Sequence, residues 1–166
     1  ARGASAMNLI KRLLVAIVVS ATLALAAGRL GWLEGPVPND LGVTEGRLKP
    51  PARVPNSVSS QADPASKAFI EPLQAKFGDR DGRATLAALQ TIVQAMPGAE
   101  VVKSDGPYLY AQFTSMWFRF VDDTEFWFDA GAGVVHVRSA SRLGESDLGV
   151  NRARIESIRA QLAASP

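Results

Sequence analysis

Cysteine is absent from all 166 residues of the chain, and histidine occurs once, as His136. The absence of thiols excludes disulfide bonds, thiol catalysis and cysteine-ligated zinc. It does not distinguish an oxidising compartment from a reducing one. Any histidine-dependent catalysis therefore has His136 as its single candidate base.

Acidic residues are missing from the first 33 positions, which carry four of the 18 basic residues. The remaining chain therefore has 14 basic against 16 acidic residues, a net charge of −2. A mildly acidic remainder without a basic stripe lacks the electrostatic footprint of a nucleic-acid-binding protein. We expect no nucleic-acid partner.

Charge is also absent from residues 13–28, an apolar run that follows Lys11 and Arg12. One interpretation is a secretory signal with Ala24-Leu25-Ala26 as its small-x-small cleavage site. The other is a retained membrane helix over residues 13–33. Such a helix is long enough, since a bilayer core needs roughly 20 apolar residues.

We favour the retained helix, which would anchor the chain in the lipid bilayer. Arg29 near its end can extend its charge to the interface, and Trp32 suits the aromatic belt. The basic flank of residues 1–12 is typical of a cytoplasmic N-terminus. The expected localisation is the bacterial inner membrane, as a single-pass protein with the rest of the chain in the periplasm.

Residues 34–66 are rich in proline, with six of the ten prolines of the chain before residue 65. Fixed φ angles and missing donors predict an extended or irregular arm without a regular ladder. The favoured role for the arm is a spacer that lifts the domain off the bilayer. Against this role stands a compact polar cluster that a mere spacer does not need, which comprises Asn56, Ser57, Ser59, Ser60 and Gln61.

Residues 67–166 are expected to form one α+β domain. The pattern predicts a short edge strand at 70–73, a helix at 81–96 capped by Asp81, strands at 100–104, 108–114, 122–128 and 134–140, and a final helix at about 148–163. These elements predict a two-layer fold, an antiparallel four-stranded meander with two helices on one face, preceded by the N-terminal transmembrane helix.

The second hairpin of this meander has a predictable register. If residues 130–133 form the loop, Glu125 lies opposite Arg138 and Trp127 lies opposite His136. Phe126 then lies on the other face, which is apolar and faces the helices. A slip of one residue would exchange the two faces.

The most polar stretch of the chain is residues 137–156, which hold four arginines and three serines between apolar positions. Buried polar groups need partners, so we expect this stretch to meet the arm and the Asp122-Asp123 pair in one network, with Asp147 or Asn151 organising the turn into the last helix. The candidate binding residues are Asn56, Ser57, Ser59, Ser60, Asp122, Asp123, Glu125, Arg138, Ser139, Ser141, Arg142, Asp147, Asn151 and Arg152.

Two functions for the arginines of this stretch remain open. Arg138, Arg142 and Arg152 near a helix N-terminus can bind a small anionic ligand such as a carboxylate or phosphate. Internal pairing with acidic side chains, Glu125 among them, would instead make them structural.

Metal binding and hydrolysis are less favoured. Asp122 and Asp123 point to opposite faces of a strand, so they do not gather oxygens around a metal, and we expect no metal or cofactor. Ser139 and Ser141 lack the glycine-flanked elbow of serine hydrolases. His136 is then more easily explained as a structural residue.

A run of large apolar residues, Met116, Trp117 and Phe118, is either part of the core or an exposed contact for a protein partner.

Three segments resemble a known family. They are PNSVSSQAD in the arm, FVDDTEF at the third strand of the meander, and VRSASRLGESDLGVNRARIE after it. Over residues 40–162 the chain resembles the bacterial and plastid family called domain of unknown function fourteen-ninety-nine. The resemblance implies an exported or membrane-attached domain, thylakoid-lumenal in plastid relatives, and no established activity. It also implies that cysteines often stand at the positions of Pro51 and Ser57, so this chain lacks both together.

The expected function is that of a membrane-anchored, periplasm-facing, non-enzymatic binding module, an accessory or assembly subunit of a membrane protein complex. The alternatives are a protein that binds a small anion or a lipid ligand, or a hydrolase that uses Asp or Glu side chains with His136.

Overall fold

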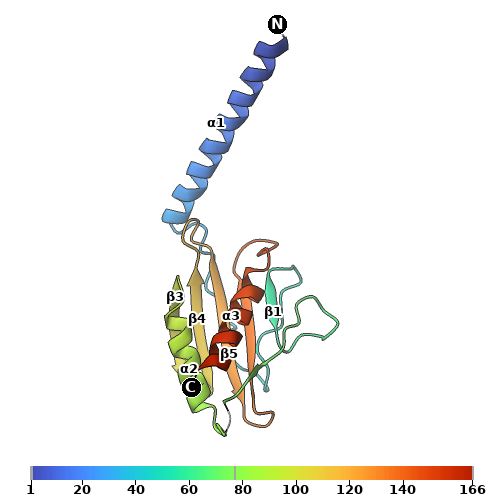
Figure 1. Cartoon of the computed structure of the whole chain (residues 1–166), viewed down its shortest axis with the longest axis vertical. Coiled ribbons are helices and arrows are strands. Elements are labelled where there is room, and N and C mark those ends of the chain that lie inside the picture. Colours follow the sequence, from blue (N-terminus) through green and yellow to red (C-terminus); the bar gives the residue numbers. More distant parts are fainter. Residues whose placement is uncertain (1, 77, 166) are drawn as a thin grey trace.

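A long apolar helix, α1 (Arg2–Arg29), stands apart from the rest of the computed structural model, which describes residues 2–76 and 78–165 (Figure 1). Its 23-residue stretch Met7–Arg29 is long and apolar enough to cross a membrane. A membrane anchor and a signal sequence both fit this description.

The helix ends four residues before the predicted end at residue 33, because a glycine closes it. Gly31 has a φ of 77° and donates its N–H to Gly28 O at 3.0 Å. Trp32 N–H bonds to Ala27 O, also at 3.0 Å. Together these bonds form a Schellman motif, which satisfies the last carbonyls of the helix.

The predicted meander is present as four consecutive antiparallel strands, β3 (Ala99–Asp105), β4 (Tyr108–Thr114), β5 (Val121–Asp129) and β6 (Val134–Ser141). The prediction of a four-stranded sheet is nevertheless wrong. Two short strands, β1 (Ser57–Ser59) and β2 (Leu73–Gln74), pair antiparallel with β6 and give a six-stranded sheet.

The arm therefore does contribute a ladder, contrary to expectation. β1 lies between Pro55 and Pro64, in a stretch where every residue keeps its N–H donor. The predicted edge strand at 70–73 is instead the two-residue strand β2, which begins at Leu73, directly after Pro72, because proline cannot donate to a ladder.

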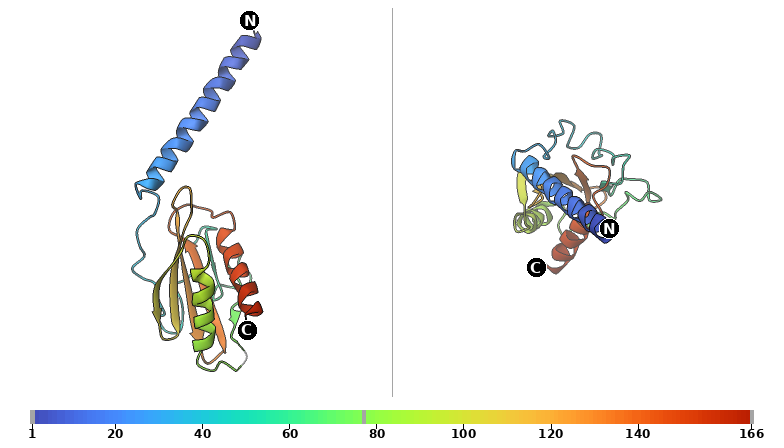
Figure 2. Two further views of the ribbon diagram at one scale, coloured as in Figure 1. Left: turned by 60° about the vertical axis from the view of Figure 1, so that its left-hand side comes forward. Right: turned by 90° about the horizontal axis from the view of Figure 1, so that it is seen from above.

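Two helices, α2 (Arg83–Gln94) and α3 (Val150–Ala164), cover one face of the sheet (Figure 2). Leu89 of α2 and Ile155 of α3 are fully buried in one apolar cluster with Phe126 and Val137 of the sheet. Both helices begin two residues later than predicted.

Asp81 does not cap α2, contrary to the prediction. The N-cap is Gly82, at a φ of 75°, and a Cβ there would lie 2.3 Å from the ring of Phe128. Only glycine allows this approach. Asp79 acts in place of Asp81, since its Oδ2 accepts the Thr85 N–H at 2.7 Å.

The predicted register of β5 and β6 is confirmed. Glu125 pairs with Arg138 and Trp127 with His136, while Phe126 lies opposite Val137. Phe126 is buried in the core under the helices, so Glu125 and Trp127 lie on the opposite face.

That opposite face is covered by the arm, which corrects both the two-layer prediction and the spacer hypothesis. Gly42 N–H donates to Glu125 Oε1 at 2.7 Å. Leu48 is buried at 3 % exposure, and a Cβ at Gly46 would lie 3.7 Å from the Trp127 ring. The sheet is therefore enclosed between helices on one side and the arm on the other.

Candidate functional site

Asn151, the second residue of α3, joins three separate segments on the helix side of the sheet. Its Nδ2 donates to Asn56 O at 3.2 Å and to Ser141 Oγ at 3.1 Å, and its Oδ1 accepts from Ser139 Oγ at 2.5 Å. Asn56 Nδ2 in turn donates to Gly144 O at 2.7 Å. The predicted meeting of the arm with the polar stretch after β6 is confirmed.

Asp147 organises the turn into α3, as predicted. Its Oδ1 accepts the Gly149 N–H at 3.0 Å and its Oδ2 accepts the Asn151 N–H at 2.8 Å. Burial alone would raise the pKa of Asp147, but these two N–H donors outweigh burial and lower the pKa below its usual value. The negative charge at this helix N-terminus is thus stabilised.

Arg154 completes the helix-side network, and the sequence interpretation missed it. Its guanidinium donates to Asp122 Oδ2 and to Asn151 Oδ1, both at 2.6 Å, and lies 4.3 Å from the Phe113 ring centroid. Its position three residues after Asn151, on the same side of the helix, was the available indication.

A second network lies on the arm side of the sheet, around Asp123. Arg142 binds this carboxylate with two hydrogen bonds, from Nε at 2.9 Å and from Nη2 at 2.8 Å. Tyr110 OH donates to it at 2.6 Å. These hydrogen bonds raise the pKa of Arg142, while burial and the Asp123 contact raise the pKa of Tyr110.

Glu125 and Arg138 form a pair beside the Asp123 network. Arg138 Nη1 lies 3.3 Å from Glu125 Oε2, and the side chains are 6 % and 0 % exposed. Glu125 Oε1 also accepts from Tyr108 OH at 2.8 Å and from the Gly42 N–H of the arm. The pair is covered by the arm, so it is not a solvated surface ladder.

Asp122 and Asp123 therefore belong to different networks, although they are adjacent in sequence. Asp122 bonds to α3 through Arg154, and Asp123 bonds to Arg142 on the other face. The prediction that they point to opposite faces is confirmed. The single network expected from the sequence is in fact two networks, separated by the sheet.

The serines of the arm are used to hold the arm in place. Ser57 Oγ accepts the Ala52 N–H at 2.9 Å; Ser57 stands at one of the two positions where the family resemblance implies a cysteine, and Ala52 follows the other, Pro51. Ser59 Oγ accepts the Gln61 N–H at 3.2 Å. Ser60 Oγ accepts the Val137 N–H of β6 at 2.9 Å.

His136 lies between a serine and an aspartate. Its Nδ1 is 3.1 Å from Ser60 Oγ, and its Nε2 is 3.7 Å from Asp129 Oδ2. Burial lowers the pKa of His136 below its usual value, so the imidazole is neutral at neutral pH. Ser60 is only 8 % exposed, and Val137 already occupies its oxygen, so this serine is poorly placed to attack a substrate.

Arg152, a predicted anion-binding residue, is occupied by the main chain. Its Nη2 donates to Lys67 O and Phe69 O, each at 2.7 Å. Arg159 lies about two turns further along α3. Its guanidinium donates in the same way to Glu71 O and Pro72 O. These two arginines fasten the segment before β2 to α3.

Within the described residues, no group of three histidine, aspartate or glutamate side chains is arranged to hold a metal ion. The polar networks are nearly filled. Among the described residues, buried side-chain atoms without a hydrogen bond are Asn56 Oδ1 and Arg138 Nε.

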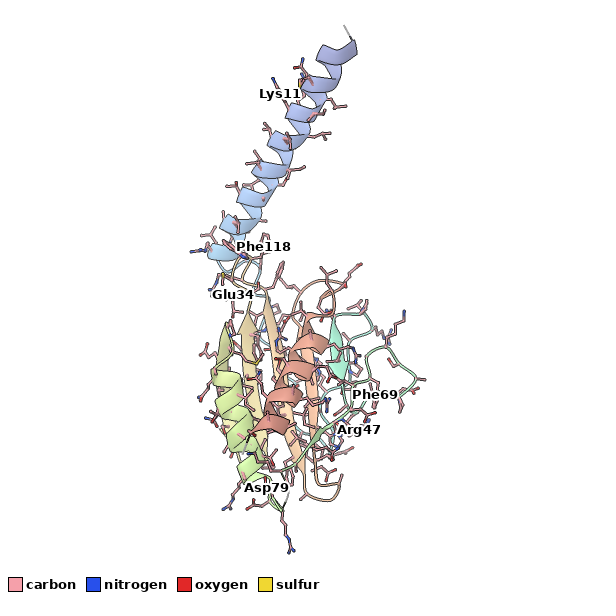
Figure 3. All side chains as sticks on the ribbon, in the orientation of Figure 1. Lys11, Glu34, Arg47, Phe69, Asp79 and Phe118 are labelled. Atoms are coloured by element: carbon pink, nitrogen blue, oxygen red, sulfur yellow. The ribbon has the colours of Figure 1, made fainter. Side chains whose placement is uncertain are left out.

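The loop between β4 and β5, residues 115–120, is exposed and apolar, and we call it the α1-proximal loop. Met116 is 74 % and Trp117 is 64 % exposed, and Phe118 is also exposed, so these three residues do not belong to the core. The loop lies against the end of α1 (Figure 3). A Cβ on Gly28 would lie 2.4 Å from Phe118 O, and Arg119 pairs with Glu34 at 2.8 Å.

A cavity of about 780 Å³ opens beside this loop, on the helix side of the sheet, and we call it the α1-proximal cavity. Its walls come from the residues after α2, the α1-proximal loop, the segment after β6, the first turns of α3 and the adjoining ends of β4, β5 and β6. Its apolar lining includes Met96, Phe113, Met116, Phe120, Leu143 and Val150. Sequence reasoning did not predict this cavity, because its walls come from several segments that are far apart in the chain.

Comparison with curated proteins and with solved structures finds no match. A comparison with protein-family models matches residues 47–162 to the model described as "Protein of unknown function (DUF1499)". This range contains both polar networks and all six strands, and it agrees with the resemblance of the three sequence segments. The chain therefore belongs to the DUF1499 family of proteins of unknown function.

Proposed function

We propose that this chain is a membrane-anchored, periplasm-facing, non-enzymatic binding module that serves as an accessory or assembly subunit of a membrane protein complex. The observation that carries the proposal is the position of the α1-proximal loop. Its exposed Met116 and Trp117 lie where the apolar helix meets the domain. Exposed apolar patches at such a place favour contact with another protein.

The state of the polar networks supports binding over catalysis. Asp123, Glu125 and Asn151 are buried and hydrogen-bonded within the protein. Groups held in this way stabilise a fold and have little freedom to receive a substrate. The hydrolase alternative would use Asp or Glu side chains with His136, but the His136 ring already lies against Ser60 Oγ at 3.1 Å and Asp129 Oδ2 at 3.7 Å.

The experiment is site-specific photo-crosslinking in native membranes. A photoreactive phenylalanine analogue at Trp117 is expected to give an adduct with a membrane protein. The matched control carries the same analogue at Arg80, an exposed residue that follows Asp79. Asp79 lies at the end of the domain farthest from α1 (Figure 3). We expect no adduct from the control.

Met116→Asp provides the second arm of this test. It places a charge on the exposed loop and should abolish the adduct from Trp117 while the melting temperature stays within experimental error, because Met116 has little burial to lose. Equal adducts from Trp117 and Arg80, or none from either, would refute docking through the α1-proximal loop.

A further inference from the structure

The α1-proximal cavity is large enough for a ligand. Its volume of about 780 Å³ falls within the roughly 300–1,000 Å³ of typical small-molecule pockets. The walls are mainly apolar, with Met96 just after α2, Phe113 from β4 and Val150 from α3. Such a lining suits a hydrocarbon chain better than a polar metabolite.

The charged groups on the cavity wall already have partners within the protein. Arg154 forms an ion pair with Asp122 at 2.6 Å, and the Asp147 carboxylate accepts two backbone N–H groups. Because these groups are already engaged, none of them is free to select an ion. The occupant of the cavity is expected to be neutral along the part that enters.

The rim of the cavity exposes apolar side chains that the domain does not need for its core. Leu148 is 93 % exposed and has a φ of 53°, a left-handed conformation that leucine rarely adopts. Met116 and Val150 are also exposed. A backbone strained to hold a leucine outward indicates a role outside folding.

The rim also lies near the membrane helix. The α1-proximal loop and the segment that leads into α3 are both at the end of the domain nearest to α1 (Figure 2). Residue 28 of α1 lies against Phe118 of this loop. With α1 across a bilayer, the rim is next to the membrane surface, and its apolar side chains face lipid.

We propose that the α1-proximal cavity binds an acyl chain of a bilayer phospholipid, which enters over Leu148 and Met116. This inference rests on the membrane anchoring in the proposed function and is independent of a protein partner. The occupant comes from the lipid surface because that surface is the source of hydrocarbon closest to the rim.

The test uses the full chain in vesicles of phosphatidylethanolamine and phosphatidylglycerol. A small fraction of the phosphatidylethanolamine carries a photoreactive diazirine at the end of one acyl chain. After irradiation, labelled residues are identified by peptide mass spectrometry. We expect label on α1 and on the inner wall at Met96 and Phe113, which an unbound chain end in the bilayer does not reach.

Two variants test entry into the cavity. Ala153→Phe fills it from an exposed position of α3 that lines its wall. The inner-wall label should fall at least about tenfold, because each excluded CH₂ already contributes roughly fourfold to binding. Leu148→Asn introduces a side chain that tolerates the left-handed conformation. It should reduce the label on the inner wall, because it removes an apolar side chain from the rim.

The matched control is Ala160→Phe, the same substitution two turns further along α3 at an exposed position outside the cavity lining. It should keep the label of the unmodified chain. Melting temperatures identify a variant that fails to fold, and Leu148→Asn then carries the test.

Label on α1 without label on the inner wall would overturn lipid binding and leave membrane anchoring intact. Inner-wall label that persists in both Ala153→Phe and Leu148→Asn would also overturn it. If neither α1 nor the inner wall is labelled, membrane anchoring is refuted, and the lipid-binding proposal that rests on it is refuted as well. Cross-links from the inner wall to a protein in native membranes, in place of lipid, would show that the cavity takes a peptide segment.

Discussion

At the scale of single residues, the domain uses three arginines, with side chains at most 9 % exposed, in three separate ion pairs. Arg154 pairs with Asp122, Arg142 with Asp123 and Arg138 with Glu125. Removing one partner of such a pair leaves an uncompensated charge in a poorly solvated place, which costs far more than breaking an exposed pair. These pairs therefore make the domain sensitive to single substitutions at its polar positions.

Arg142→Ala should destabilise the domain severely. The Arg142 and Asp123 side chains are 5 % and 2 % exposed, so we expect a loss of about 3 kcal/mol or more in the free energy of unfolding. Urea denaturation of the purified chain measures this loss. Arg83→Ala breaks the exposed pair with Asp81 and should cost less than about 1 kcal/mol; similar losses for both variants would contradict the structural role.

His136 should make the stability of the domain depend on pH. Burial lowers its pKa in the folded state below the usual histidine value of about 6.5, so the unfolded chain binds the proton more readily. The contribution of His136 to stability is complete above the unfolded pKa and is lost as the pH falls from there through the lowered folded pKa. Below both values no further loss comes from this residue.

We therefore expect the melting temperature to fall between pH 8 and pH 5. His136→Gln should show a smaller fall over the same range, because glutamine does not titrate. Circular dichroism at a series of pH values measures both. An identical pH dependence in the two proteins would assign the effect to carboxylates and not to His136.

At the scale of elements, the strands and helices of the meander were predictable, and the docking of the arm was not. The register of β5 and β6 was predictable from the alternation of apolar and polar residues and from the four-residue loop. A shift of the pairing by one residue would exchange the apolar face of the hairpin for the charged one. The arm has no such periodicity. Its contacts to Glu125 and Trp127 depend on residues far away in the chain.

The candidate site shows the same division. The polar stretch after β6 indicated where buried hydrogen bonds would be needed, and Asn151 and Asp147 were identified from it. The partner of Asp122 was missed, because Arg154 on an amphipathic helix has the same local pattern as a solvent-facing arginine. Only the packing of α3 on the sheet distinguishes an arginine that pairs with Asp122 from one that faces solvent.

Leu48→Ala should loosen the arm and leave the sheet intact. Leu48 belongs to the arm and is buried, and loss of a buried leucine costs roughly 2–5 kcal/mol. Hydrogen exchange at the Gly42 amide, which donates to Glu125, should then speed up by more than about tenfold.

The exchange of amides in β5 should change less than that of Gly42, because its ladders with β4 and β6 remain. Val43→Ala is the matched control, since Val43 is exposed and should have little effect. Equal acceleration in the arm and in β5 would show that the arm and the sheet unfold as one unit.

At the scale of the whole molecule, α1 decides whether the domain is tethered or released. Its apolar stretch Met7–Arg29 fits both an anchor and a signal sequence. We expect the helix to be retained, so protein isolated from membranes should yield N-terminal residues upstream of Ala26. A mature chain that starts at Ala27 would instead give a freely diffusing exported domain, and both membrane proposals would fail.

The short junction between α1 and the domain also limits where the protein can act. Gly28 lies against Phe118, and the Arg119 pair with Glu34 adds a second contact within a few residues of the helix end. With α1 retained in a bilayer, as proposed, a tether this short would keep the domain at one height and confine it to a thin layer. Binding sites that stand well above the bilayer would then be out of reach, whereas those level with its surface would see a high local concentration of the domain.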